Sequence, residues 1–118
     1  MAYKEIQIGE QKVPMQCKAS VNLYYKQIFG EDPIIKQSDG DMTSGEGIIF
    51  AQQLAFVMAK AAEANGDRSK MLNLGMDEYI EWLDQFDFMD LQDALKDVMA
   101  LYAGGRKSTS QEKTGSAR

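Results

Sequence analysis

Residues 43–66 read TSGEGIIFAQQLAFVMAKAAEANG, and this stretch decides the fold. From Ile48 to Ala64 it is apolar on nearly every side, and a helix of that kind is normally buried all round. Thr43 and Glu46 have capping-box spacing, in which each side chain bonds a free backbone N–H group at the helix start. Asn65-Gly66 is a typical helix stop. We therefore expect a central helix around which the other elements pack.

A β-hairpin is expected before this helix, over residues 4–17. Apolar and polar residues alternate in two runs, 5–8 and 12–18, which is typical of half-buried strands. Gly9-Glu10-Gln11 supplies a short connection. Because Pro14 has no N–H group, we expect the second strand to be an edge strand or to pair through its other side.

Between the hairpin and the central helix we expect one clear helix and one short one. Ser20 has the character of an N-cap and Gly30 of a stop. The buried stripe of this helix is Val21, Tyr24, Tyr25 and Ile28. Asp32-Pro33 repeats the start signal for a short second helix, and residues 38–45 have the composition of a loop.

After the central helix, residues 67–75 are ambiguous, and whether they extend that helix stays open. Two amphipathic helices are expected next. The shared face of the first is Met76, Tyr79, Ile80, Leu83 and Phe86. Asp87 or Asp90 is expected to cap the second, which Gly104-Gly105 closes. The buried stripe of the second is Leu91, Leu95, Val98, Met99 and Tyr102.

One domain over residues 1–105 and a flexible tail over residues 106–118 are expected, because 118 residues fit a single core. The tail is rich in Ser, Thr, Lys, Gln and Gly and has no apolar residue larger than alanine, which is typical of disorder. The expected fold class is mainly α (α+β): a compact helical domain of four to five helices with a small N-terminal β-hairpin and a disordered C-terminal tail.

Composition argues against enzymes and metal proteins. The chain has no histidine, so the common catalytic triads and most zinc sites cannot be built. Its single cysteine, Cys17, cannot form an internal disulfide, which fits a reducing cytoplasm. The acidic residues of 77–97 are spaced three or four apart without a glycine, unlike a calcium-binding EF-hand loop. We expect no catalysis, no cofactor and no metal site.

Charge and hydropathy argue against two further kinds of partner. The net charge is −5 and the acidic residues gather in 77–97, so the folded part should repel nucleic acid. No apolar run approaches the ~18 residues that suggest a membrane span. Residues 1–5 lack the basic and apolar start of a signal peptide. We expect neither a nucleic acid nor a membrane as partner.

The sharpest candidate for a binding site is residues 81–90, EWLDQFDFMD. Aromatic and methionine side chains ringed by carboxylates form either a hinge packed inside a helical hairpin or a protein interface, and the sequence favours neither. Trp82 and Leu83 are adjacent, so they cannot both lie centrally on one narrow stripe. The candidate protein-interaction residues are Trp82, Phe86, Phe88 and Met89.

Four segments, taken in order, resemble a known family. They are Lys12-Val13-Pro14, YYKQIFGED at 24–32, FVMAK at 56–60 and YIEWLDQFD at 79–87. Over roughly residues 4–103 this order is similar to the tail assembly chaperones of long-tailed bacteriophages and prophages of Gram-positive bacteria. Each segment is a packing signature, and only their order together carries the resemblance.

The resemblance implies a non-enzymatic chaperone made in the host bacterial cytoplasm and absent from the mature virion. Members of the family bind the tape measure protein, keep it soluble and help tail tube subunits polymerise around it. Many also exist in a longer, frameshifted form whose extension recruits the tail tube protein, and residues 106–118 would suit a linker to such an extension. Coating a long client also implies self-association, plausibly head to tail.

Two other functions stay open on the sequence alone. One is a small acidic phage regulatory or anti-host protein that binds a bacterial protein through its acidic helices. The other is a structural tail component that is retained in the virion.

Overall fold

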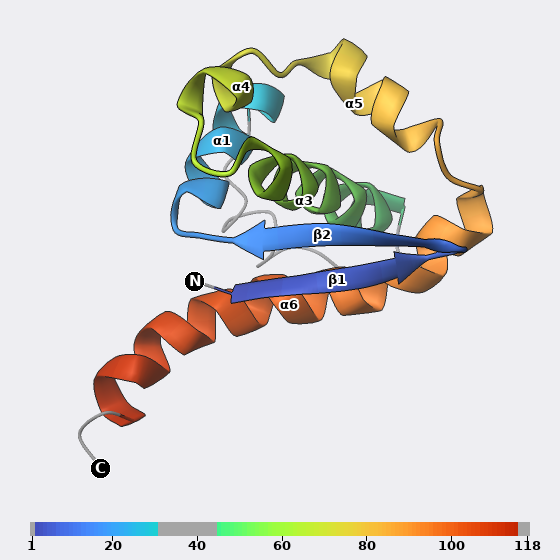
Figure 1. Cartoon of the computed structure of the whole chain (residues 1–118). Helices are drawn as coiled ribbons and strands as arrows, with labels where there is room; N and C mark the ends of the chain where they lie inside the picture. Colours follow the sequence, from blue (N-terminus) through green and yellow to red (C-terminus); the bar gives the residue numbers. More distant parts are fainter. Residues whose placement is uncertain (1, 31–44, 116–118) are drawn as a thin grey trace.

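The computed structural model describes residues 2–30 and 45–115, and in that part it confirms the expected fold class (Figure 1). The elements are β1 (Ala2–Ile8), β2 (Gln11–Cys17), α1 (Ser20–Phe29), α3 (Gly45–Ala64), α4 (Arg68–Leu72), α5 (Met76–Leu83) and α6 (Phe88–Gly115). The short helix expected at Asp32-Pro33, nearly all of the loop expected at 38–45, and Thr43 of the expected capping box lie outside the described residues.

The hairpin is the expected one, with a tighter turn. Ile8 pairs with Gln11, so the turn consists of Gly9-Glu10 alone, and Gly9 has φ +62. In such a hairpin, hydrogen-bonded and non-bonded pairs alternate from the turn outward. Pro14, opposite Glu5, therefore falls at a non-bonded position and removes no ladder bond.

Helices α3 and α6 cover the same face of the hairpin and contact each other, with α3 along β2 and α6 along β1 (Figure 1). The hairpin residues buried on this face are Ile6, Ile8, Met15 and Cys17. The predicted central role of α3 is confirmed, because residues 54–59 are at most 1% exposed. Helix α3 also contacts α1, α4 and α5, which explains why it is apolar on every side.

At the ends of α1 and α3, both predicted helix stops are confirmed, and one predicted start is not. Gly30 (φ +78) ends α1, and Asn65 and Gly66, both at positive φ, follow the end of α3. Ser20 was expected to cap α1, and this prediction is wrong: Ser20 is the first helical residue. The chain is already helical at Ala19, and the N–H group of Val21 bonds the carbonyl of Lys18 at 3.0 Å, so a turn of backbone replaces the side-chain cap.

The ambiguous residues 67–75 contain a separate short helix, α4, and do not extend α3. Asp67 caps α4: its Oδ1 accepts hydrogen bonds from the Ser69 hydroxyl at 2.7 Å and from the Ser69 N–H group at 3.0 Å. These bonds, the hydroxyl's above all, hold the pKa of Asp67 below its usual value. Met71 is buried and anchors α4 on the domain.

The predicted face of α5 is confirmed in part. Tyr79 is buried and Leu83 and Phe86 are partly buried against the core. Met76 and Ile80 are 52% and 49% exposed, and Trp82, which the prediction left off this face, is buried instead. The apolar arc of α5 is wider than the strip that α3 can cover, so the side with the large rings is buried and the aliphatic side is left outside.

Helix α6 follows its predicted stripe but not its predicted end. Leu91, Leu95, Val98 and Tyr102 are buried, and Met99 is half-buried. The helix does not stop at Gly104-Gly105: its backbone continues to Gly115 and projects beyond the hairpin (Figure 1). Gly104 does not adopt the left-handed conformation of a helix stop, and no proline follows it.

We expect Gly9→Ala to destabilise the domain by about 1–2 kcal/mol. An added Cβ would be held at φ +62 and would lie 2.6 Å from Oδ2 of Asp90. Gly66→Ala is the matched control, because Gly66 also has positive φ (+91) but has open space around it. Urea denaturation measures both variants. An equal loss in the two would show that contact with Asp90 contributes nothing.

Candidate functional site

The four candidate residues divide into core and surface. Trp82 is 3% exposed, and its ring centroid lies 5.9 Å from that of Phe56 and 4.9 Å from that of Phe86. The Trp82 side chain therefore packs inside the domain, which agrees with the interpretation of residues 81–90 as a packed hinge. Phe86 is half-buried, whereas Phe88 and Met89 are 61% and 55% exposed.

An aromatic cluster fixes α5 on the domain. The ring centroid of Tyr79 lies 5.0 Å from that of Phe29 and 5.3 Å from that of Phe56, in edge-to-face arrangements. Burial raises the pKa of Tyr79 to about 12, so its hydroxyl keeps its proton near neutral pH. This cluster therefore supports the neighbouring surface and offers no acid–base chemistry of its own.

Asp87 fixes the residue at which α6 begins and therefore which side chains lie in its first turn. Its Oδ2 accepts a hydrogen bond from the N–H group of Met89 at 3.2 Å, which is the geometry of an N-cap. The sequence offered Asp87 or Asp90 for this role, and the structure selects Asp87. Phe88 and Met89 thus occupy the first turn of α6, before the buried stripe begins at Leu91.

A groove of about 350 Å³ lies between the hairpin turn and the segment that joins α5 to α6, and we call it the junction groove. Its lining includes Gly9, Glu10, Gln85, Phe86, Asp87 and Asp90. The lining residues from 85–90 lie in the segment that the sequence predicted as a candidate binding site. The hairpin-turn residues were not predicted. Nothing in the local pattern of Gly9-Glu10 signals contact with residues far along the chain.

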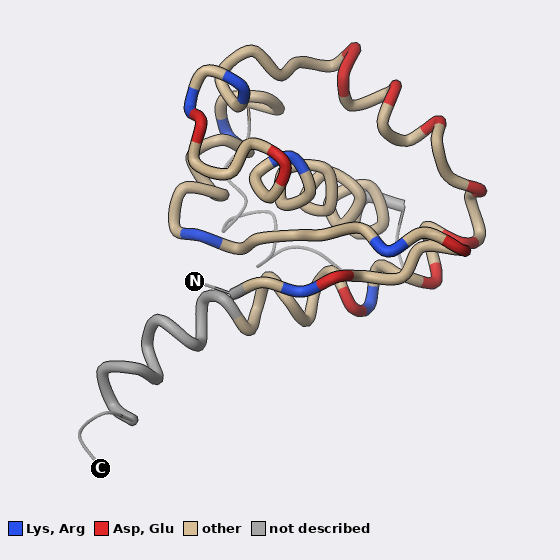
Figure 2. Tube along the Cα trace, in the orientation of Figure 1, with Lys and Arg blue, Asp and Glu red and all other residues tan. Residues whose placement is uncertain are grey.

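A second exposed apolar pair, Met76 and Ile80, lies one turn apart on α5. Acidic side chains follow the same helix and continue to the start of α6 (Figure 2). Those that lie on α5 are Asp77, Glu78 and Glu81, all exposed. We call the partly or fully exposed apolar residues of this region the junction surface: Met76, Ile80, Phe86, Phe88 and Met89.

Within residues 2–30 and 45–115, no three His, Cys, Asp or Glu side chains are grouped so as to hold a metal ion. Among the side chains that the structure places, those of residues 3–30 and 47–104, no polar or charged residue is fully buried. In the same ranges, no helix is both long and apolar enough to cross a membrane.

Comparisons of the chain with protein-family models, with curated proteins and with solved structures found no match.

Proposed function

We propose that this chain is a non-enzymatic assembly chaperone that binds apolar helical segments of a client protein through the junction surface. The observation that carries the proposal is the exposure of Phe88 and Met89 between two exposed acidic residues, Asp87 and Asp90. Exposed large apolar groups rimmed by charge are typical of protein-binding sites.

The energetics suit a client that is apolar and prone to aggregate. Full burial of a Phe or Met side chain contributes about 1.5–3 kcal/mol, so Phe88 and Met89 can anchor a helix of the client. Methionine adapts to different partner shapes, which suits a surface that meets many segments of one long client. The surrounding carboxylates keep the complex soluble and favour segments with flanking basic residues.

The identity proposed for the client rests on the resemblance of the four sequence segments described above to the phage tail assembly chaperones. We propose that the client is the tape measure protein of a long-tailed phage and that the chain assists assembly of the tail tube. This role places the chaperone in the host bacterial cytoplasm and outside the mature virion. It also implies self-association along the client and, in a frameshifted longer form, an attachment to the tail tube protein beyond α6.

Co-expression with the tape measure protein tests the proposal. We expect the tape measure to be soluble only when this chain is present and to co-purify with many copies of it. A tape measure that stays insoluble, with nothing co-purifying, would contradict the proposed function.

The acidic row itself favours a second candidate, a small regulatory protein that binds a basic host protein. Asp77 and Glu81 are exposed on α5 and available to such a partner, whereas Glu78 accepts the N–H group of Gly75 at 2.7 Å and caps the helix. Charge reversal by Asp77→Lys and Glu81→Lys should abolish that binding while leaving client solubilisation largely intact. A structural tail component, the third possibility, would be detected by mass spectrometry of purified particles.

A further inference from the structure

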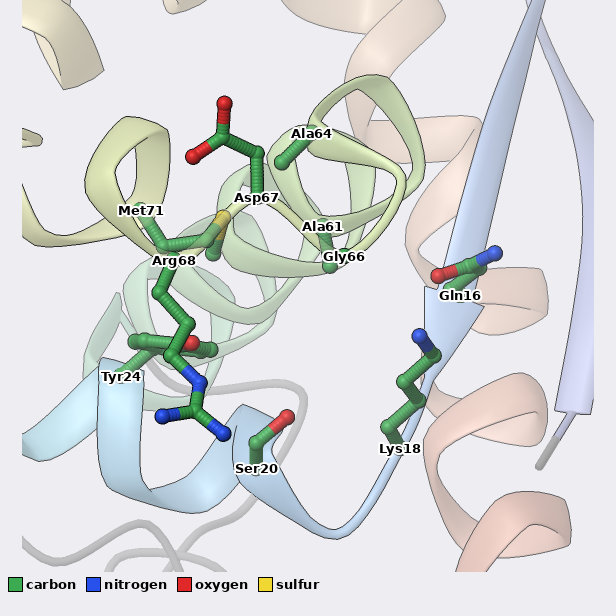
Figure 3. Close-up of a pocket in the computed structure, with 10 residues that line it drawn as sticks. All are labelled: Gln16, Lys18, Ser20, Tyr24, Ala61, Ala64, Gly66, Asp67, Arg68 and Met71. Atoms are coloured by element: carbon green, nitrogen blue, oxygen red, sulfur yellow. The ribbon is translucent and has the colours of Figure 1, made fainter.

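A second pocket lies at the other end of the hairpin from the junction groove, where β2 leads into α1 and α3 leads into α4 (Figures 1 and 3). Its volume is about 240 Å³. None of its lining residues belongs to the junction surface, so whatever it binds is separate from the proposed client site. Two of its lining residues, Lys18 and Arg68, are basic, although the chain as a whole carries a net charge of −5.

Two cations face this pocket without a neutralising partner. Lys18 comes from the end of β2 and Arg68 from the first turn of α4, and neither forms an ion pair within the described part of the chain. The carboxylate that also lines the pocket, Asp67, is engaged by Ser69 and points away from the two cations (Figure 3). The pocket therefore favours an anionic group, and a guanidinium binds a planar carboxylate through two parallel hydrogen bonds.

Gln16 adds a requirement that a simple anion does not meet. Its Oε1 is buried and has no hydrogen-bond partner, and in Figure 3 this oxygen faces the other lining residues. A buried acceptor of this kind needs a donor. An inorganic anion offers mainly acceptors, whereas the last residue of a peptide carries an N–H group on the same Cα as its terminal carboxylate.

The remaining wall is largely apolar. Ala61 and Ala64 of α3, Met71 of α4 and Tyr24 of α1 contribute to it. The volume is below the ~300–1,000 Å³ of pockets that enclose drug-sized ligands. The pocket is therefore suited to the end of a chain and not to a long segment.

We propose that this pocket binds the C-terminal end of a peptide chain. Arg68 and Lys18 hold the terminal carboxylate, with the Ser20 hydroxyl as a further donor. Gln16 accepts the N–H group of the last peptide unit, and a small apolar side chain lies against Ala61 and Ala64. Capture of a terminal carboxylate is a known mode of peptide recognition.

An NMR titration of the full chain with N-acetyl-Ala-Ala bearing a free carboxylate tests the assignment. We expect the backbone amide of Gly66 and the side-chain amide of Gln16 to shift as the peptide saturates the pocket. The same dipeptide with an amidated C-terminus should bind at least tenfold more weakly. N-acetyl-Asp-amide carries its carboxylate on a side chain, and binding of this compound as tight as that of the free-carboxylate dipeptide would overturn the assignment to a chain end.

Variants locate the binding. Arg68→Gln and Lys18→Gln should each weaken peptide binding at least tenfold. Lys70 is an exposed cation of α4 that does not line the pocket, so Lys70→Gln should leave binding unchanged. Equal shifts with the free and amidated dipeptides, or equal affinity in Arg68→Gln and Lys70→Gln, would overturn the proposal. Either result leaves the client-binding proposal intact, because no residue of the junction surface is involved.

Discussion

Replacing Phe88 and Met89 together by serine is expected to abolish solubilisation of the client while the domain stays folded. Both side chains are more than half exposed, so little of their burial contributes to folding. On binding, burial of the parts that are still exposed would contribute about 2–3.5 kcal/mol in total, which corresponds to a loss of affinity of roughly 30- to 300-fold. Co-expression with the tape measure protein and the far-UV circular dichroism of the variant are the two measurements.

Leu23→Ser is the matched control for that double variant. Leu23 lies on α1 and is 65% exposed. Its replacement by serine removes a similar apolar group from a different surface. We expect client solubilisation to persist in Leu23→Ser. If the two proteins solubilise the client equally well, the junction surface is not the binding site.

Trp82→Ala should have the largest effect on stability of any single change in α5. The ring is almost fully buried and packs against Phe56 and Phe86, and truncation of such a side chain costs about 3–5 kcal/mol. That is a large part of the ~5–15 kcal/mol that normally stabilises a domain. Urea denaturation followed by circular dichroism measures the loss.

Phe86→Ala provides the comparison for Trp82→Ala. Phe86 is only half-buried, so its truncation should cost clearly less stability. If Trp82→Ala unfolds at the same urea concentration as the unaltered chain, the aromatic cluster does not hold α5 in place. A loss of client binding in Trp82→Ala would by itself say nothing about contact, because it would follow from unfolding.

The sequence predicted the central helix well because a helix that is apolar on every side is stable only where it is buried on every side. It predicted the buried face of α5 only in part, because Met76 and Ile80 are exposed and Trp82 is buried in their place. Its apolar arc includes both the aromatic side with Tyr79 and the aliphatic side with Ile80, and only tertiary packing decides which side the neighbouring helix covers. Periodicity gives the existence of such a stripe, not the part of it that is buried.

The junction groove and the second pocket differ in how far the sequence could predict them. Phe86, Asp87 and Asp90 stand close together in the chain, so half of the junction groove was visible as a cluster. Lys18 and Arg68 are fifty residues apart, and each has the appearance of an ordinary solvent-exposed cation. Only the packing of α4 beside the start of α1 brings them to one pocket.

The pairing of the first strand with the last helix also determines when the domain can form during synthesis. β1 is covered by α6, and the hydroxyl of Tyr102 donates to Oδ1 of Asn22 at 2.7 Å, which links residues 80 positions apart in the chain. The buried side chains of β1 therefore stay uncovered until the residues of α6 that pack on this strand have left the ribosome. Two translation products that share residues 1–102 and diverge afterwards would complete the same core before their different extensions emerge.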